Sequence, residues 1–108
     1  MSVGDYLPLK GKVTGAQDQV VILAGTAAKI IGIRKIIIGV SDATSVRLQD
    51  NGVVPKSLTP IFDLAANAIL TMDYPRPSSA PKTNAGNGIT ITTSAGNVAF
   101  DIEYWLEP

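Results

Sequence analysis

Short segments of alternating apolar and polar residues, separated by turn-forming residues, run through most of the chain. Val46-Arg47-Leu48-Gln49 and residues 98–104 are the clearest examples, with Asn51-Gly52 and Gly96-Asn97 among the turns that bound them. A period of two predicts a β-strand with one buried side and one solvent-facing side. Short strands with such turns between them are typical of an antiparallel sandwich or barrel.

The pattern predicts about eight strands and no stable helix. The strands cover residues 9–14, 19–23, 29–40, 45–50, 59–64, 68–73, 88–93 and 97–105, with a further short return at 53–54. The one helical candidate, 64–70, is too short to be stable alone. A chain of 108 residues has the size of one domain, so we expect a single β-sandwich over 1–108, in which 1–9 can form an extended N-terminal arm.

Two turns and two faces can be assigned from the same pattern. Asn51-Gly52 fits a type I′ turn, whose central residues both need positive φ, and Ser94-Ala95-Gly96 is expected to join the last two strands as an antiparallel hairpin. The residues expected to face inward are Val46, Leu48, Val98, Phe100, Ile102 and Tyr104. Those expected to face outward are Arg47, Gln49, Asp101 and Glu103.

The segment 29–40 differs from the others because it is apolar on both faces at both ends. A β-bulge near Gly32 or at Arg34-Lys35 would switch the phase of this strand. Two apolar faces would both need cover, one from the opposite sheet and the other from a loop of the same chain or from a second subunit. We expect the second subunit, because a domain of this size has little loop to spare.

The residue types that most enzymes use are missing. The chain has no Cys and no His, which removes thiolate nucleophiles, Cys-ligated zinc and the commonest general base. Asp101 and Glu103 form the only candidate carboxylate pair for glycoside hydrolysis or calcium binding, but outward acids on a terminal strand are usually solvated. Gly86-Asn87-Gly88 precedes a strand rather than a helix, so it is not a dinucleotide-binding motif. We expect no enzymatic activity, metal or cofactor.

Charge and hydropathy argue against nucleic acid and membrane partners. Nine basic and nine acidic residues cancel, so there is no broad basic field for nucleic acid or an anionic membrane. The longest apolar stretch, 30–40, is too short for a membrane span, and 1–10 lacks the apolar run of a secretory signal. The proline-rich segment 74–81 is interpreted as a crossover loop or, alternatively, as a ligand for a groove-binding domain.

The charges are unevenly distributed along the chain. After Lys82 there is no Lys or Arg, but Asp101, Glu103 and Glu107 follow, so this segment carries −3 and the remainder +3. The segregation fits either a solvated sheet edge or charge pairing between neighbouring subunits. Trp105 shares the phase of Asp101 and Glu103, and it is either an interface anchor or a cap on the end of the sandwich.

Several of these segments together resemble a known group of proteins. They are Val20-Val21-Ile22-Leu23, Ile31-Gly32-Ile33, Val46-Arg47-Leu48-Gln49-Asp50, and the closing stretches 88–91 and 98–104. In these the chain resembles the small jelly-roll virion proteins of tailed bacteriophages, which include capsid decoration (cement) proteins, head fibres and other appendages. The resemblance covers about residues 19–104 and is one of pattern. Such proteins are usually homotrimers that attach to capsid or tail surfaces without enzymatic activity.

The resemblance implies a jelly-roll sandwich located in the virion, assembled as a homo-oligomer, most often a trimer. We expect an oligomeric decoration protein that binds the major capsid protein or another virion protein. The strand patterns, rather than the resemblance, place the subunit or capsid interface at Arg34, Lys35, Ile36, Ile38, Val40, Asp101, Glu103 and Trp105. The alternative is a carbohydrate- or receptor-binding sandwich of a phage tail or fibre, with Tyr6, Tyr74 and Trp105 as the rings available for stacking on sugars.

Overall fold

The alternating segments form eight strands in a computed structural model that describes residues 6–108. The strands are β1 (Leu7–Thr14), β2 (Gln17–Leu23), β3 (Ile30–Val40), β4 (Thr44–Asp50), β5 (Phe62–Leu64), β6 (Ile69–Asp73), β7 (Ile89–Thr93) and β8 (Asn97–Glu107). A single 3₁₀ turn, η1 (Pro77–Ser79), lies in the proline-rich loop that connects β6 to β7. The predicted return at 53–54 is wrong, because both valines lie in the loop between β4 and β5.

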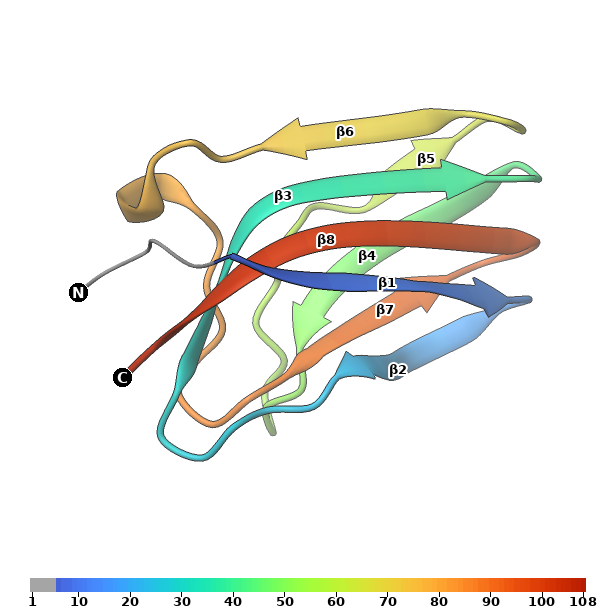
Figure 1. The fold of residues 1–108 in the computed structure, drawn as a ribbon. Helices are drawn as coiled ribbons and strands as arrows, with labels where there is room; N and C mark the ends of the chain where they lie inside the picture. The colour runs from blue at the N-terminus through green and yellow to red at the C-terminus, as the bar shows by residue number, and fades with distance from the viewer. Residues whose placement is uncertain (1–5) are drawn as a thin grey trace.

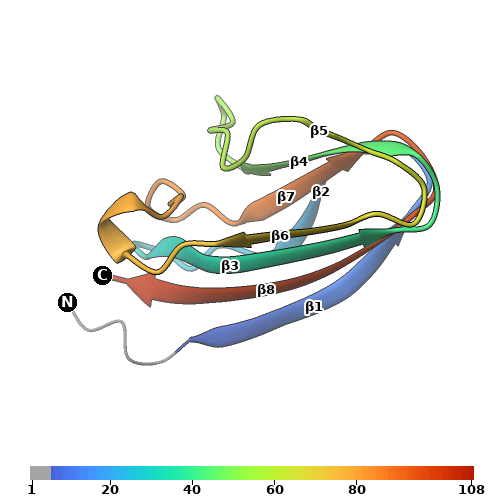
Figure 2. The same ribbon diagram turned by 90° about the horizontal axis from the view of Figure 1, so that it is seen from above.

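Two antiparallel four-stranded sheets are stacked on one another (Figures 1 and 2). Sheet A has the strand order β1-β8-β3-β6 and sheet B the order β2-β7-β4-β5. The chain crosses between the sheets at every connection except β4 to β5, which are neighbours in sheet B. Two interlocked four-stranded sheets of this order make a jelly roll. The predicted antiparallel jelly-roll sandwich is therefore confirmed.

Inward-facing aliphatic side chains of both sheets form the core. β-Branched residues dominate it, as expected for side chains that pack well on a pleated surface. The most deeply buried are Ile31, Ile33, Ile36, Ile38, Val46, Leu48, Ile89, Ile91, Val98 and Ile102. Of the residues predicted to face inward, Val46, Leu48, Val98, Phe100 and Ile102 are buried, whereas Tyr104 is only partly buried.

A bulge explains the apolar pattern of β3. The register of β3 against β8 shifts between Ile33 and Lys35, which leaves Arg34 as the extra residue and switches the phase of the strand. Ile31 and Ile33 before the bulge and Ile36 and Ile38 after it therefore point into the same core. The predicted phase switch is confirmed. The expectation that a second subunit must cover the strand loses its basis, because the four isoleucines share one face.

A loop of the same chain also lies along the first half of β3. The amide of Ile33 donates to the carbonyl of Pro81, and the amide of Thr83 donates to the carbonyl of Ile31, both at 3.0 Å. The hydroxyl of Thr83 in turn accepts a hydrogen bond from the amide of Ile31. The end of the proline-rich loop thus covers the part of this edge that β6 does not reach.

The two predicted turns do not form. β7 and β8 lie in different sheets, so Ser94-Ala95-Gly96 makes a corner between sheets and does not close a hairpin. Neither Asn51 nor Gly52 has positive φ, which excludes a type I′ turn. Asn51 instead binds the loop before β7, because its side-chain oxygen accepts from the amide of Gly88 at 2.8 Å.

Two further predictions need correction, one for the N-terminal arm and one for the outward face of β4. Residues 7–9, expected in a free arm, begin β1 and are paired with β8, and residues 1–5 of the predicted arm lie outside the described residues. In β4, Arg47 is partly exposed as expected. The prediction that Gln49 faces outward is wrong, because this residue is buried and lies opposite Ser57 of the following loop.

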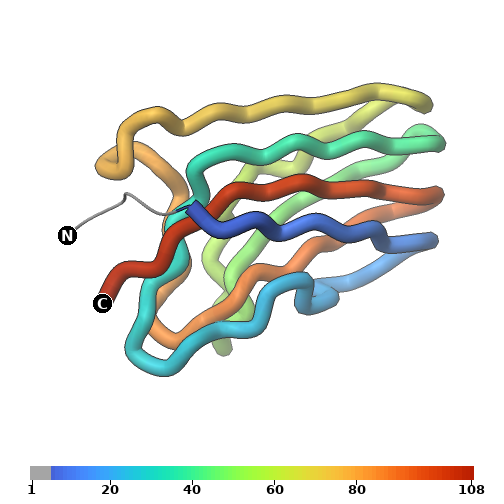
Figure 3. The backbone as a smooth tube through the Cα atoms, in the orientation of Figure 1, coloured from blue at the N-terminus to red at the C-terminus, as the bar shows by residue number. Residues whose placement is uncertain are grey.

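The two ends of the sandwich differ in the length of their connections (Figure 3). The short turns 15–16, 41–43, 65–68 and 94–96 gather at one end, and the longer connections 24–29, 51–61 and 74–88 gather at the other. We call these the short-turn end and the long-loop end.

Asp50, the last residue of β4, ties two of the long loops together. Its side chain is fully buried. The carboxylate accepts hydrogen bonds from the amides of Gly52, Lys56 and Asn84 and from the side-chain amide of Asn87, at 2.9–3.2 Å. Burial raises the pKa of this carboxyl, but the four hydrogen bonds outweigh burial and hold the pKa below its usual value.

Candidate interaction surface on sheet A

The outward-facing side chains of sheet A form one continuous surface, which we call the outer face of sheet A. The pairing registers arrange it in three rows across β1, β8, β3 and β6. The rows are Pro8, Glu103, Lys35 and Asp73; Lys10, Asp101, Ile37 and Thr71; and Lys12, Ala99, Gly39 and Ile69. The first two rows carry most of the charged residues, whereas the third row has the small residues Ala99 and Gly39 at its centre.

Opposite charges alternate along the first row and form one pair in the second. Lys35 lies between Glu103 and Asp73 in register, and Lys10 Nζ is 3.9 Å from Asp101 Oδ2. A shallow depression of about 330 Å³ lies among these groups. Exposed ion pairs of this kind contribute little to stability. Their arrangement is better suited to orienting a charged partner than to holding the fold together.

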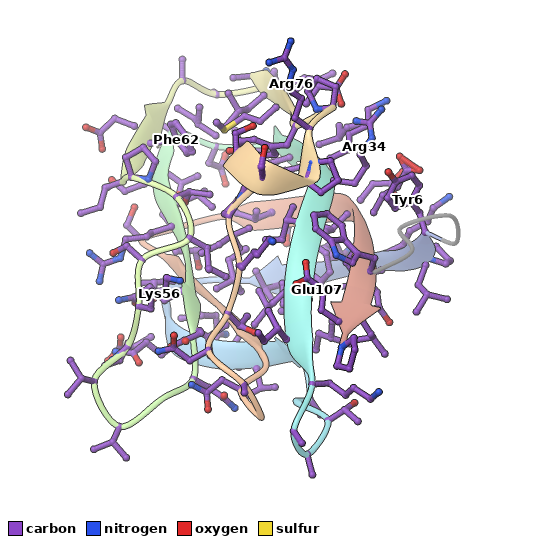
Figure 4. All side chains as sticks on the ribbon, turned by 90° about the vertical axis from the view of Figure 1, so that its left-hand side faces the viewer. Tyr6, Arg34, Lys56, Phe62, Arg76 and Glu107 are labelled. Atoms are coloured by element: carbon purple, nitrogen blue, oxygen red, sulfur yellow. The ribbon has the colours of Figure 1, made fainter. Side chains whose placement is uncertain are left out.

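The bulge of β3 adds Arg34 to the same surface. Its guanidinium forms a salt bridge with Asp73 of β6 and lies over the ring of Tyr6, with Cζ 5.7 Å from the ring centroid. Figure 4 shows Tyr6 and Arg34 side by side, viewed from the long-loop end. The bulge therefore has two effects. It keeps the isoleucines on both sides of it pointing into the core, and it places a cation beside an aromatic ring on the outer face.

Trp105 caps the long-loop end of this surface and is almost completely buried, at 1% exposure. Its ring lies against Gly32, where an added Cβ would come within 2.2 Å of Cζ2. Tyr6 packs edge-on against it, with ring centroids 6.2 Å apart. The indole Nε1 donates to Glu107 Oε2 at 2.8 Å. Trp105 was predicted to be either an exposed interface anchor or a cap on the end of the sandwich. Its burial agrees with the cap and not with the exposed anchor.

Glu107 links this cap to the proline-rich loop. The ammonium of Lys82 is 2.9 Å from Glu107 Oε2 and 5.9 Å from the centroid of the Trp105 ring. The hydrogen bond from Lys82 lowers the pKa of the Glu107 carboxyl; burial opposes this, and the bond from Trp105 adds to it. The C-terminal end of β8 is thereby fixed to a loop that is distant in sequence.

The C-terminal acids lie beside cations of the same chain. Asp101 pairs with Lys10, and Glu107 pairs with Lys82, while Glu103 is opposite Lys35 in register. The segregation of charge along the sequence is thus largely balanced within the fold. It leaves no separate block of negative charge for a neighbouring subunit.

The structure divides the eight predicted interface residues into two groups. Arg34, Lys35, Asp101 and Glu103 come together on the outer face of sheet A. Ile36, Ile38, Val40 and Trp105 do not, since they are 0%, 1%, 6% and 1% exposed. Ile36, Ile38 and Val40 face inward because of the bulge. They belong to the core and cannot contact a partner while the fold is intact.

Several residues of the outer face of sheet A were not predicted from the sequence. Lys10 and Lys12 alternate with Leu9 and Gly11 in β1, and this alternation could have placed them outward. Ile69, which is 75% exposed, and Asp73 reach the surface only through the pairing of β6 with β3. No local signal predicts that pairing.

Residues 6–108 contain no cluster of three or more acidic residues placed to hold a metal ion. No helix within this range is long and apolar enough to cross a membrane. No protein-family model matches the chain, and no curated protein is significantly similar to it. The fold and this surface define a small jelly-roll β-sandwich with a charged outer sheet face.

Proposed function

We propose that the protein is a non-enzymatic structural component of a tailed-phage virion: an oligomeric decoration protein that binds the head surface through the outer face of sheet A. The observation that carries the proposal is the ordered array of alternating charges on this face. Alternating charges can fix the orientation of a bound surface more than they raise its affinity. The jelly-roll connectivity supports the same class of protein.

The size of the face supports an oligomer. Four strands about 4.8 Å apart and about eight residues long at 3.3 Å per residue give roughly 500 Å². A stable interface usually buries about 800 Å² on each partner. One copy would therefore bind weakly, and several copies joined together would gain by simultaneous attachment. A homotrimer on the major capsid protein is the form we propose.

Mass spectrometry of purified virions tests the location. Copy numbers that scale with the major capsid protein are expected for a decoration protein. A charge reversal tests the surface: Lys35→Glu should weaken binding to isolated capsids at least tenfold, whereas Lys29→Glu, in the loop between β2 and β3, should not. Absence from the virion, or unchanged binding by folded Lys35→Glu, would contradict the proposal.

The alternative is carbohydrate or receptor binding by a tail or fibre protein. It has less support, because Trp105 is buried and Tyr74 is partly buried, whereas Tyr6 is 39% exposed. A few copies per virion, located on the tail, together with glycan-array binding that is lost in Tyr6→Ala, would favour it over capsid decoration.

A further inference from the structure

The loop between β4 and β5 ends in an apolar tip. Val53 and Val54 are consecutive, and they are 103% and 84% exposed. The base of the loop is closed on both sides of these residues, because Asp50 accepts hydrogen bonds from the amides of Gly52 and Lys56 and donates its own amide to the carbonyl of Lys56 at 2.8 Å. We call Val53 and Val54 the valine tip.

The base of the loop that carries the valine tip is fixed before any partner binds. Lys56 marks the base of the loop in Figure 4, and from there the loop projects beyond the sheets. A segment that is already ordered loses little conformational entropy on binding. Isolated exposed apolar residues are common on protein surfaces. Two adjacent valines on a braced projection are better explained by a matching depression.

Sheet B carries such a depression on its outer face. It has a volume of about 320 Å³ and is lined by Ser45, Val46, Arg47, Ile61, Thr92, Thr93 and Ser94. Ile61 is 59% exposed, which gives the depression an apolar wall. We call it the sheet B pocket. Its volume, at the lower end of small-ligand sites, suits two small side chains.

The valine tip cannot reach the pocket of its own chain. The pocket lies at the start of β4 and the end of β7, towards the short-turn end. The tip follows the end of β4, at the long-loop end. At about 3.3 Å per residue, the strand between them separates the two by roughly 15 Å. Only a second copy can bring a tip and a pocket together.

Charge at the two surfaces is complementary. Lys56 adjoins the valine tip, and Asp63 adjoins the sheet B pocket, where it accepts a hydrogen bond from the hydroxyl of Ser45 at 2.6 Å. Asp63 also lines a neighbouring depression that shares Ser45 and Ser94 with the pocket. Within residues 6–108, neither Lys56 nor Asp63 takes part in an ion pair. Each is available to the other across a contact between copies.

We propose that the valine tip of one copy docks into the sheet B pocket of a second copy, with Lys56 of the first beside Asp63 of the second. The two surfaces differ, so the contact is head-to-tail and leaves one tip and one pocket free until a ring closes. The contact is too small for a stable open dimer, which favours a closed ring. This inference rests on the self-association in the proposed function and leaves the outer face of sheet A free for the capsid.

Cysteine cross-linking tests the contact, because the chain has no Cys of its own. Val54→Cys and Ile61→Cys chains, one carrying a mass tag, are mixed in equal amounts and oxidised. The head-to-tail contact predicts that the mixed dimer exceeds either homodimer severalfold. A chain with both substitutions should give a ladder that ends at the closed ring. Val21→Cys, exposed on β2, is the control partner for Val54→Cys and should give only random cross-links.

Charge exchange provides a second readout. Lys56→Glu and Asp63→Lys should each lower the yield of the mixed cross-link severalfold, and Lys56→Glu on the tip chain with Asp63→Lys on the pocket chain should restore it. Dominant Val54→Cys homodimers, or mixed dimers no more abundant than with Val21→Cys, would overturn the inference.

Light scattering of the unmodified protein separates the two proposals. An oligomer that lacks the tip-to-pocket cross-link overturns the inference and leaves the proposed function standing. A monomer that is absent from virions overturns the proposed function as well. Loss of capsid binding by Val54→Ser with an unchanged oligomer would place the valine tip on the capsid, and it would also overturn the inference.

Discussion

The contact between Gly32 and Trp105 can be tested by adding one methyl group to β3. In Gly32→Ala the new Cβ would lie 2.2 Å from Cζ2 and 2.4 Å from Cε2 of the indole. The ring is held from other sides, since Nε1 is bonded to Glu107 and Tyr6 packs against it. Either the ring must leave its position or β3 and β8 must shift apart locally.

The expected cost follows from the packing. Overpacking a dense site usually costs about 1–3 kcal/mol, and loss of the whole buried Trp would cost about 3–5 kcal/mol. We expect Gly32→Ala to lose about 2–3 kcal/mol, which for a domain of this size lowers Tm by about 10–20 °C. Thermal unfolding followed by circular dichroism measures the loss. Fluorescence reports the ring directly, because Trp105 is the only Trp; its emission should shift to the red.

Gly39→Ala is the matched control in the same strand. A Cβ at Gly39 would have nothing within 4 Å, and Ala restricts the unfolded chain more than Gly does. This variant should be neutral or more stable by about 0.5 kcal/mol. If both variants melt within about 2 °C of the unmodified protein, and the Trp emission is unchanged in both, Trp105 does not pack on Gly32 as described.

Three further predictions concern buried polar groups near the end of β4. Asp50→Asn should lose about 2–4 kcal/mol in urea unfolding because it disrupts four hydrogen bonds, whereas Asp18→Asn, at an exposed position, should stay within about 0.5 kcal/mol. The pKa of Asp50 is lowered in the folded state, so the ionised carboxylate stabilises the fold above the unfolded pKa of about 3.9. This contribution is lost as the pH falls through the folded pKa. Asp50→Asn should therefore flatten the decline in stability below about pH 4. Gln49→Met should gain about 1 kcal/mol because it removes a buried Oε1 that lacks a hydrogen-bond partner; an unchanged or lower midpoint would mean that this oxygen is satisfied by water.

Local pattern predicted the strands and most of their faces, but not their partners. Val98, Phe100 and Ile102 alternate with polar residues in the same way whether β8 pairs with β7 or with β1 and β3. The hairpin prediction failed because the choice of partner depends on contacts that are distant in sequence. The prediction of a type I′ turn at Asn51-Gly52 failed for the same reason, since Asn51 forms its hydrogen bonds with Gly88 of another loop.

The candidate surface was predictable only in part. Asp101 and Glu103 were assigned to an exposed face from their phase, Lys35 was predicted as an interface residue, and the structure brings the three together. The pattern left Trp105 as either an exposed anchor or a buried cap, and it could not choose between them, because its neighbours Tyr6 and Gly32 are brought to it by separate strand pairings. A period of two assigns a side chain to a face of the sheet, but it does not reveal what covers that face.

The central position of β8 has a consequence for biosynthesis. β1 pairs only with β8, and β3 pairs with β8 along most of its length. During translation β1 must therefore wait, with both edges unpaired, until residues 97–107 have left the ribosome. Open strand edges are sites of aggregation, and pairings between distant segments form slowly. Nascent chains stalled before Asn97 should be the form that chaperones bind.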